Sequence, residues 1–271
     1  MAPSRDTVRI FAMAQKAPTY RLTAAGRSAW ENEDLAVPED YRRILWLMDF
    51  HGQDGVVGEL LHRYPRNVLD EWLAEMEDLG LIEVSPGGQD SGSTFSTREA
   101  DRTLGLDQAR MRREGASASA ALARTGAYIS ADRLSRRPAP RKPLADTVVL
   151  IVEDDPDQLA LADLRVSMAG YKVRVAKSVN EFLHSMLDQG APDLLLLDVV
   201  LPDGNGFELL TKMRRHAVLG SLPIVMLTAE NEAEDIGKGL LLGADGYITK
   251  PYTKNILADV IRRILKQEGN V

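Results

Sequence analysis

The chain has 271 residues with a net charge of −7, from 33 basic and 40 acidic residues, and it contains no cysteine. At roughly 150 residues per domain, this length predicts about two domains. The acidic balance disfavours nucleic acid and anionic membranes as partners. The lack of cysteine excludes disulfides, thiolate metal sites and a cysteine nucleophile. No apolar run approaches the ~20 residues that span a bilayer, and no secretory signal opens the chain, so we expect a soluble, cytoplasmic protein without membrane contact.

Residues 1–97 are predicted to form a mainly helical domain. Two strands around a glycine-rich turn are expected over 81–97, and a further strand and helix over 20–30. Apolar residues at helical spacing indicate three helices, over 37–50, 56–64 and 65–80. Three helices followed by a hairpin resemble a winged helix-turn-helix, whose third helix would enter the DNA major groove.

The charge of this domain argues against DNA binding. The expected third helix has one basic residue, Arg66, and five acidic residues, and the expected wing over 81–97 has no lysine or arginine. Affinity for duplex DNA comes largely from neutralised phosphates, which this surface would repel. A basic stretch partly compensates, through Arg5, Arg9, Lys16, Arg21 and Arg27. We therefore expect a protein-interaction or homodimerisation output, with a DNA-binding transcription regulator as the alternative.

The segment 98–145 is basic, with eleven basic residues over 98–147 against six acidic ones. Its sequence GASASAALARTGA (115–127) favours a short alanine-rich helix. The following RRPAPRKP (136–143) is typical of an extended, polyproline-like spacer. We therefore predict a basic linker over 98–145, helical in part, and a domain boundary near residue 145.

Residues 146–271 alternate between strands and helices, which predicts an α/β fold. Strands are expected at VVLIV (148–152), YKVRVA (171–176), DLLLLD (193–198), PIVMLTA (223–229) and DGYIT (245–249), each followed by an amphipathic helix. Right-handed crossovers would place these helices on both faces of one doubly wound, five-stranded parallel sheet.

Polar residues end four of these strands, on the edge where such folds bind ligands. They are Glu153-Asp154-Asp155, Asp198, Thr228 and Lys250. Unpaired carboxylates at one edge would repel each other, and a divalent cation relieves that repulsion. Mg2+ typically takes one or two carboxylates together with phosphate oxygens. The pattern therefore predicts a magnesium and phosphate site around one nucleophilic carboxylate.

Four motifs in order carry a family resemblance: VLIVEDDP, LLLLDVVLPDGNG, VMLTA and YITKPY. With this order and spacing, residues 146–271 closely resemble the CheY-like, flavodoxin-like receiver domain of two-component response regulators. The resemblance implies that Asp198 accepts a phosphoryl group from a phosphohistidine on a sensor histidine kinase or phosphotransfer protein. It implies a phosphorelay protein rather than an enzyme in its own right.

The same resemblance implies roles for the other motif residues. Glu153 and Asp154 match the acidic pair that positions Mg2+, together with Asp198 and the backbone carbonyl of Val200. Thr228 and Lys250 would bond the phosphoryl oxygens, a charge-assisted role. Tyr247 would rotate into the space that Thr228 vacates after phosphorylation. A cis Lys250–Pro251 bond is also implied.

Several residues have a structural alternative. One residue of register turns Asp155 away from the site, and Asp203 fits a turn better than a ligand role. Tyr247 could simply be packed. For the whole site, the alternative is a degenerate receiver that keeps the fold without phosphorylation. His51 and His62 could only be phosphohistidines in a helix bundle, and no such pattern surrounds them.

Overall fold

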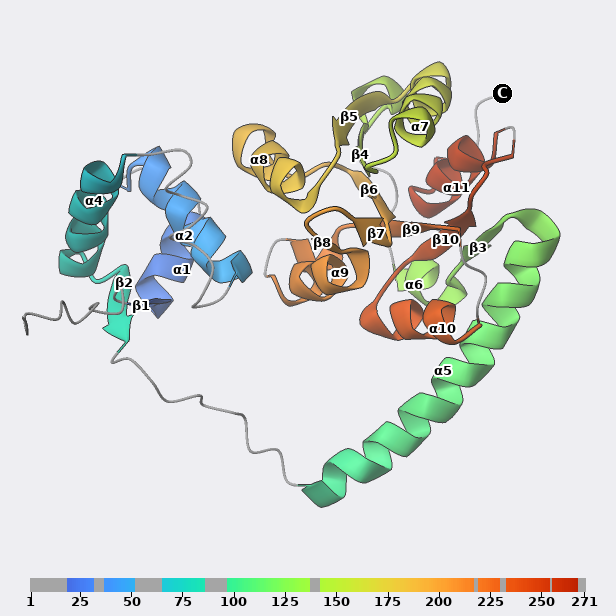
Figure 1. The fold of residues 1–271 in the computed structure, drawn as a ribbon, viewed down its shortest axis with the longest axis horizontal. Helices are drawn as coiled ribbons and strands as arrows, with labels where there is room; N and C mark the ends of the chain where they lie inside the picture. Colours follow the sequence, from blue (N-terminus) through green and yellow to red (C-terminus); the bar gives the residue numbers. More distant parts are fainter. Residues whose placement is uncertain are drawn as a thin grey trace, which may run out of the picture. The chain divides into compact units, whose positions relative to one another are not determined.

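The computed structural model divides the chain into two compact units, Met1–Ser93 and Thr94–Val271 (Figure 1). The residues that it describes are 19–31, 37–51, 65–85, 97–136, 142–216, 219–229, 233–253 and 255–267. Each unit has its own buried apolar residues, so each is treated by itself.

The described part of the first unit contains helices packed beside a two-stranded sheet. Its elements are β1 (Thr19–Leu22), α1 (Ala24–Glu31), α2 (Glu39–His51), α4 (Arg66–Asp78) and β2 (Ile82–Ser85). Strands β1 and β2 pair antiparallel, with Leu22 opposite Ile82. Helices α2 and α4 contribute Ile44, Leu45, Leu69 and Met76 to the interior, all at most 1% exposed. Apolar residues three and four positions apart thus form the buried faces of these helices.

This unit agrees only in part with the expected winged helix. The helices expected over 37–50 and 65–80 are present, as are the strand and helix expected over 20–30. Strand β2, however, pairs with β1, and Thr97, the last residue of the expected hairpin, begins a helix. The helix expected over 56–64 and the turn expected over 86–92 lie outside the described residues. The winged helix therefore stays a prediction.

The second unit is built on a six-stranded sheet with the order β3-β10-β9-β6-β4-β5. Five of its strands are parallel neighbours, and β3 pairs antiparallel with β10. The strands are β3 (Ala127–Ile129), β4 (Val148–Val152), β5 (Lys172–Ala176), β6 (Leu194–Asp198), β9 (Ile224–Thr228) and β10 (Gly246–Thr249). The five parallel strands confirm the α/β fold predicted for 146–271. A short hairpin, β7 (Val200–Leu201) and β8 (Gly204–Asn205), follows β6.

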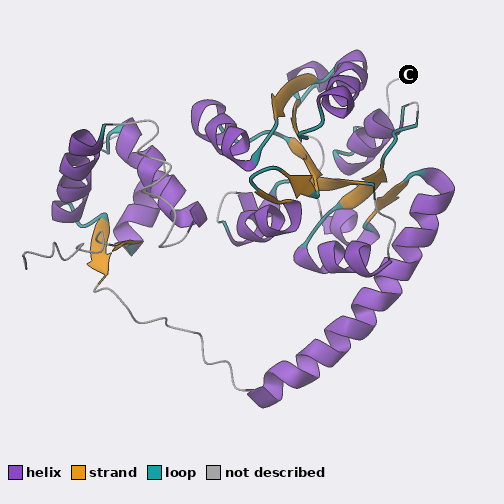
Figure 2. Cartoon of the chain, in the orientation of Figure 1, coloured by secondary structure: helices purple, strands orange, loops and turns teal. Residues whose placement is uncertain are grey.

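Helices cover both faces of this sheet (Figure 2). They are α5 (Thr97–Thr125), α6 (Ala131–Arg136), α7 (Pro156–Met168), α8 (Val179–Gln189), α9 (Gly206–Arg215), α10 (Ala233–Leu242) and α11 (Ile256–Ile264). Helices α7 and α11 share one apolar core with the sheet, formed around residues such as Val149, Leu196 and Ile261. Each of these three is fully buried. Because strand side chains alternate between faces, Leu150 and Leu195, which are also fully buried, belong to the opposite face.

The segment predicted as a linker over 98–145 is helical in part, as expected, but it is not a linker between two domains. Residues 97–136 form α5, β3 and α6, and they belong to the same compact unit as the parallel strands. Helix α5 packs against α10, and β3 extends the sheet beyond β10. The observed boundary between the units falls at Ser93, close to the expected end of the first domain at residue 97, and the boundary expected near residue 145 is not found. The closest approach of α5 to α10 is at Gly115 and Gly237, which add nothing to a hydrophobic pattern in the sequence.

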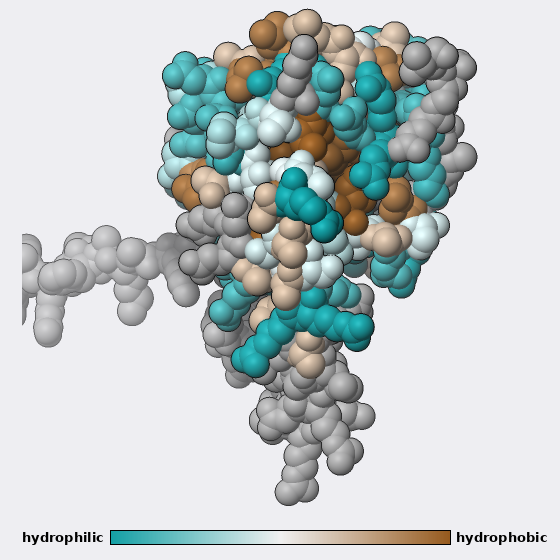
Figure 3. Space-filling view, turned by 90° about the vertical axis from the view of Figure 1, so that its right-hand side faces the viewer, coloured by the Kyte–Doolittle hydropathy of each residue, from teal (hydrophilic) through white to brown (hydrophobic). Residues whose placement is uncertain are grey.

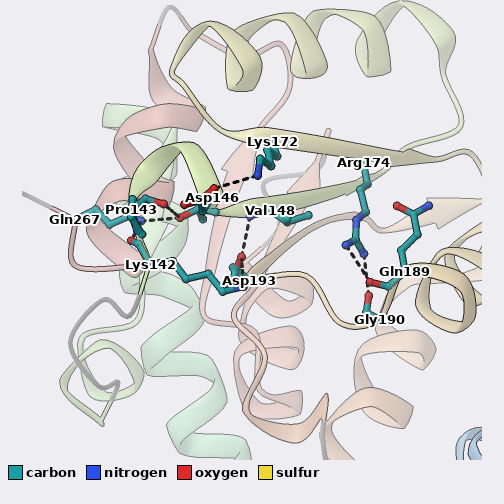
Figure 4. Close-up of polar contacts among 11 residues, drawn as sticks. Lys142, Pro143, Asp146, Val148, Lys172, Arg174, Gln189, Gly190, Asp193 and Gln267 are labelled. Atoms are coloured by element: carbon teal, nitrogen blue, oxygen red, sulfur yellow. Dashed lines mark hydrogen bonds and ion pairs between the residues drawn. The ribbon is translucent and has the colours of Figure 1, made fainter.

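Polar contacts stabilise the other edge of the sheet, where the parallel strands begin (Figure 4). The Asp193 carboxylate accepts a 2.8 Å hydrogen bond from the Val148 amide and pairs with Lys142 at 2.9 Å. The Arg174 guanidinium donates to the carbonyls of Gln189 and Gly190. These contacts fix the starts of β4 and β6 and the turn after α8.

Seen from one side, the surface is mixed, with hydrophilic residues around a recessed apolar area (Figure 3). None of the helices in the described ranges combines the length and apolar content needed to cross a membrane.

Candidate functional site

The polar residues expected at one sheet edge follow four neighbouring strands. Glu153 follows β4, Asp198 ends β6, Thr228 ends β9 and Lys250 follows β10. Thr249 lies opposite Thr228 in the β9–β10 pairing, and the Lys250 amide donates to the Thr228 carbonyl at 2.8 Å. Because these strands are parallel, their carboxyl ends meet at one edge of the sheet. The fold thus brings residues separated by about 100 positions in sequence into one site.

Three carboxylates converge there. Glu153, Asp154 and Asp198 each offer an oxygen, and these oxygens lie within 4.8 Å of one another. Glu153 is fully buried and Asp198 nearly so, whereas Asp154 is exposed. The Lys250 ammonium lies 2.5 Å from Glu153 Oε2 and 2.7 Å from Asp198 Oδ2. One lysine therefore faces the two buried carboxylates.

Burial makes the ionised form of Glu153 costly. The pKa of Glu153 is raised to about 7 from an ordinary 4.5, chiefly by desolvation and also by the nearby Asp198 carboxylate, against the opposing effect of Lys250. Oxygen Oε1 of Glu153 is buried and has no hydrogen-bond partner among the described residues. A metal cation at this position would stabilise the ionised carboxylate of Glu153 and would give its Oε1 a partner.

The donor set fits a hard divalent cation. Carboxylate oxygens are the ligands that Mg2+ prefers, and Mg2+ keeps several waters when it binds. Two carboxylates are buried, and the exposed Asp154 leaves the cluster open to solvent on one side. The residues that could hold the ion are those expected from the sequence, Glu153, Asp154 and Asp198. The part expected for the Val200 carbonyl stays a prediction.

The chain is tightly packed around the Asp198 backbone. A side chain at Gly206 would place its Cβ 2.1 Å from the Asp198 carbonyl oxygen, so only glycine fits where α9 begins. The Val200 amide points toward Asp198 Oδ1 at 3.4 Å, and Val200 itself is 69% exposed. The Asp198 backbone is thus closely packed against the start of α9, whereas the hairpin residue Val200 beside its side chain is exposed.

The structure places Tyr247 deep inside the unit, at 1% exposure. Its hydroxyl is buried without a hydrogen-bond partner among the described residues, and desolvation raises its pKa. A Cβ at Gly239 would lie 1.7 Å from this hydroxyl, so the glycine makes room for it. Thr228 is also buried, at 5% exposure. Tyr247 is therefore already inside, and its rotation after phosphorylation stays a prediction.

Two acidic residues considered as alternatives have structural roles. Asp155 is the N-cap of α7, where its Oδ1 accepts hydrogen bonds from the amides of Asp157 and Gln158, each at 2.9 Å. Asp203 accepts from the amides of Val179 and Asn180 at the start of α8. These contacts agree with the interpretation that Asp155 and Asp203 are not metal ligands.

Sequence reasoning missed Tyr252 and Arg165. The Tyr252 hydroxyl donates to Glu153 Oε2 at 3.3 Å, and burial raises the pKa of Tyr252. Arg165 of α7 donates to the carbonyls of Tyr252 and Thr253, at 2.7 and 3.0 Å, and so fixes the segment after Lys250. Tyr252 is the last residue of the YITKPY motif, and this position is the signal in the sequence that could have indicated it. The expected cis Lys250–Pro251 bond is present.

Comparison with known proteins finds similarity over the part of the chain that carries this site. Residues 149–262 match the response regulator receiver domain. Over 121 residues the chain is 35% identical to the phosphate regulon transcriptional regulatory protein PhoB of Pseudomonas aeruginosa, covering 45% of this chain and 52% of that protein. The transcriptional regulatory protein GltR of the same organism is 37% identical over 119 residues, 44% of this chain and 49% of GltR. The chain thus spans about half the length of these relatives.

Among solved structures, a response regulator from Chloroflexus aurantiacus is similar to this chain. The two are 35% identical, with a TM-score of 0.43, over 45% of this chain and 98% of that one.

Proposed function

This chain contains a response regulator receiver domain at residues 149–262, and from that premise we propose that Asp198 is the phosphoacceptor of a two-component phosphorelay. The observation that carries the proposal is the position of the Asp198 carboxylate, 2.7 Å from the Lys250 ammonium and within one cluster with Glu153 and Asp154. The donor is a phosphohistidine on a sensor histidine kinase or a phosphotransfer protein. An Asp198 oxygen forms the new O–P bond while the N–P bond of the donor breaks.

Each neighbour has a part in this transfer. The Lys250 ammonium, held between the strands, neutralises charge on the phosphoryl oxygens, and the Thr228 hydroxyl donates to one of them. Glu153, Asp154, Asp198 and the Val200 carbonyl hold Mg2+. When bound, the ion offsets the negative charge that gathers on the transferring group. The fixed backbone at Gly206 keeps Asp198 in place, so little reorganisation is needed.

The test is incorporation of a phosphoryl group from a small phosphodonor such as acetyl phosphate. Wild-type protein with Mg2+ is expected to gain one acid-labile phosphoryl group, and removal of Mg2+ by a chelator to prevent it. Asp198→Asn removes the acceptor oxygen and should abolish incorporation. Asp203→Asn is the matched control, because Asp203 is a nearby aspartate that caps α8 instead. Equal incorporation by Asp198→Asn and wild type would refute the assignment.

For the output, we propose a protein-interaction or homodimerisation role of the first unit. The charged residues of α4 support it, because all of them are exposed and they sum to a negative charge. They are Arg66, Asp70, Glu71, Glu75, Glu77 and Asp78. The second candidate is DNA binding, favoured by the match to two transcriptional regulators, although that match covers only about half of each.

Binding to a labelled random duplex at low salt separates the two outputs, because low salt favours even weak contacts with phosphates. The protein is measured with and without a phosphoryl mimic such as beryllofluoride. We expect no duplex binding in either state and a phosphorylation-dependent change in mass by light scattering. Binding that weakens steeply with added salt would instead support the transcription regulator.

A further inference from the structure

Residues 97–136, here called the arm, cover one edge of the sheet and one helix of the receiver domain. Strand β3 of the arm pairs antiparallel with β10, with Tyr128 opposite Tyr247. Helix α5 packs along α10. The arm thus contacts β10, which contains Tyr247, and α10, whose Gly239 lies next to the Tyr247 hydroxyl.

The α5–α10 contact is close and specific. A Cβ at Gly115 of α5 would lie 2.0 Å from the Ala233 carbonyl oxygen, and one at Gly237 of α10 would lie 2.5 Å from the Met111 carbonyl oxygen. The two helix backbones can approach this closely only because both positions are glycine. Ala118 and Leu122, three and seven residues after Gly115, are at most 2% exposed. These positions form one buried stripe of α5.

The arm is also connected to the phosphoacceptor site through the end of β10. Thr249 donates its amide hydrogen to the carbonyl of Gly126, the residue that joins α5 to β3, at 3.0 Å. The next residue, Lys250, contacts Asp198 at 2.7 Å. The residue that contacts the arm, Thr249, and the residue that contacts Asp198, Lys250, are therefore adjacent in sequence at the end of β10.

An ion pair fixes the other end of the arm. Arg133 of α6 pairs with the Asp245 carboxylate at 3.0 Å, just before β10, and Asp245 is 2% exposed. The same carboxylate binds Arg214 at 2.9 Å and the Ile224 amide at 2.8 Å. Strand β10 is therefore held by the arm before its first residue and at its last one.

We propose that docking of the arm and phosphorylation of Asp198 reinforce each other through β10. The arm pairs along one edge of β10 and binds its last residue, Thr249, and a phosphoryl group on Asp198 would bind Lys250 directly after it. Both events thus fix the position of the same strand end, so whichever comes first makes the second more favourable. Linkage makes the effect reciprocal. The arm is then an internal partner through which the receiver domain signals.

This inference rests on the proposed phosphorylation of Asp198, and one experiment separates the two. The chain has no cysteine, so Ala118→Cys places a unique thiol in the buried stripe. Its alkylation rate in the full chain reports undocking of α5. Ala116→Cys is the control, since Ala116 is exposed two residues away on the same helix. Both variants are treated with acetyl phosphate and Mg2+, and intact mass is used to count phosphoryl groups.

Phosphorylation is expected to slow alkylation of Ala118→Cys at least about fivefold, the lower end of ordinary coupling between sites, and to leave Ala116→Cys unchanged. An equal or faster rate in protein that carries the phosphoryl group would overturn the inference while the proposed function stands. Absence of any phosphoryl group would overturn the proposed function itself. Reciprocally, Gly115→Leu should weaken beryllofluoride binding by a similar factor, and Ala116→Leu should not. Equal beryllofluoride affinity in both leucine variants would also contradict the inference.

Discussion

The Lys250 ammonium lies 2.5 Å from the Glu153 carboxylate, so a side chain that follows β10 neutralises one that follows β4. The same ammonium lies 2.7 Å from Asp198, and Asp154 completes the acidic cluster. Without a metal ion, the single positive charge of Lys250 faces three carboxyl groups. The metal-free site is therefore electrostatically strained, and its stability should respond to each of these charges in a distinct way.

Replacing Glu153 should stabilise the metal-free protein. The pKa of Glu153 is raised to about 7 in the folded protein from an ordinary 4.5. The folded protein therefore favours protonated Glu153. The stability that this protonated form contributes is complete below about pH 4.5 and is lost as the pH rises through 7. At pH 8 Glu153→Gln should therefore gain on the order of 2 kcal/mol over wild type, and much less at pH 5. Urea unfolding in chelator at both pH values measures this, and a pH-independent difference would contradict it.

Replacing Lys250 should have the opposite effect. Lys250→Met leaves Glu153 and Asp198 buried without their shared cation, which is expected to cost roughly 3 kcal/mol in metal-free buffer at pH 8. Adding Glu153→Gln to this variant should recover part of the loss, since fewer buried charges then remain. Urea unfolding of the two single variants and the double variant gives the coupling directly. Additive effects would show that the two side chains do not interact.

Mg2+ should stabilise the wild type by binding only the folded site. At a hundred times its Kd, the expected gain in unfolding free energy is about 2.7 kcal/mol. Asp154→Asn should reduce this gain while leaving metal-free stability nearly unchanged, because Asp154 is exposed. Thermal unfolding across a Mg2+ series tests both statements. A full Mg2+ effect in Asp154→Asn would remove this residue from the ligand set.

The buried Asp245 should be more important for stability than surface ion pairs. Asp245→Asn weakens the contacts with Arg133 and Arg214, and we expect a loss of about 3 kcal/mol. Breaking the Lys172–Asp146 pair, whose side chains are both 61% exposed, should cost well under 1 kcal/mol. Urea midpoints of Asp245→Asn and Asp146→Asn provide the comparison, and similar losses would contradict the assigned role of burial.

The parallel sheet and its site were predictable because their signals are local. Strands such as Leu194–Asp198 are continuous apolar runs, and each ends directly at a chemically distinctive residue. Parallel topology then brings those ends together without further information from the sequence. Glu153, Asp154, Asp198, Thr228 and Lys250 could therefore be chosen before any geometry was known.

The arm could not be predicted in the same way. Strand β3 has only three residues, and all of them are half-buried, so no alternation identifies it. Helix α5 approaches α10 closely at Gly115, and small residues such as Ala118 make up part of its buried stripe, so the apolar periodicity of this stripe is weak. The segment therefore resembled a linker by composition. Its role arises from backbone approach and strand pairing, which depend on tertiary contacts.

The assignment of Asp198 as phosphoacceptor is tested most directly by locating the phosphoryl group. Protein phosphorylated with acetyl phosphate and Mg2+ is treated with borohydride, which reduces an aspartyl phosphate to homoserine and releases phosphate. Peptide mass spectrometry then identifies the converted position. We predict homoserine at position 198 and unchanged aspartate at 154, 155 and 203. Conversion at another aspartate, or a phosphoryl group retained on a histidine, would contradict the proposed function.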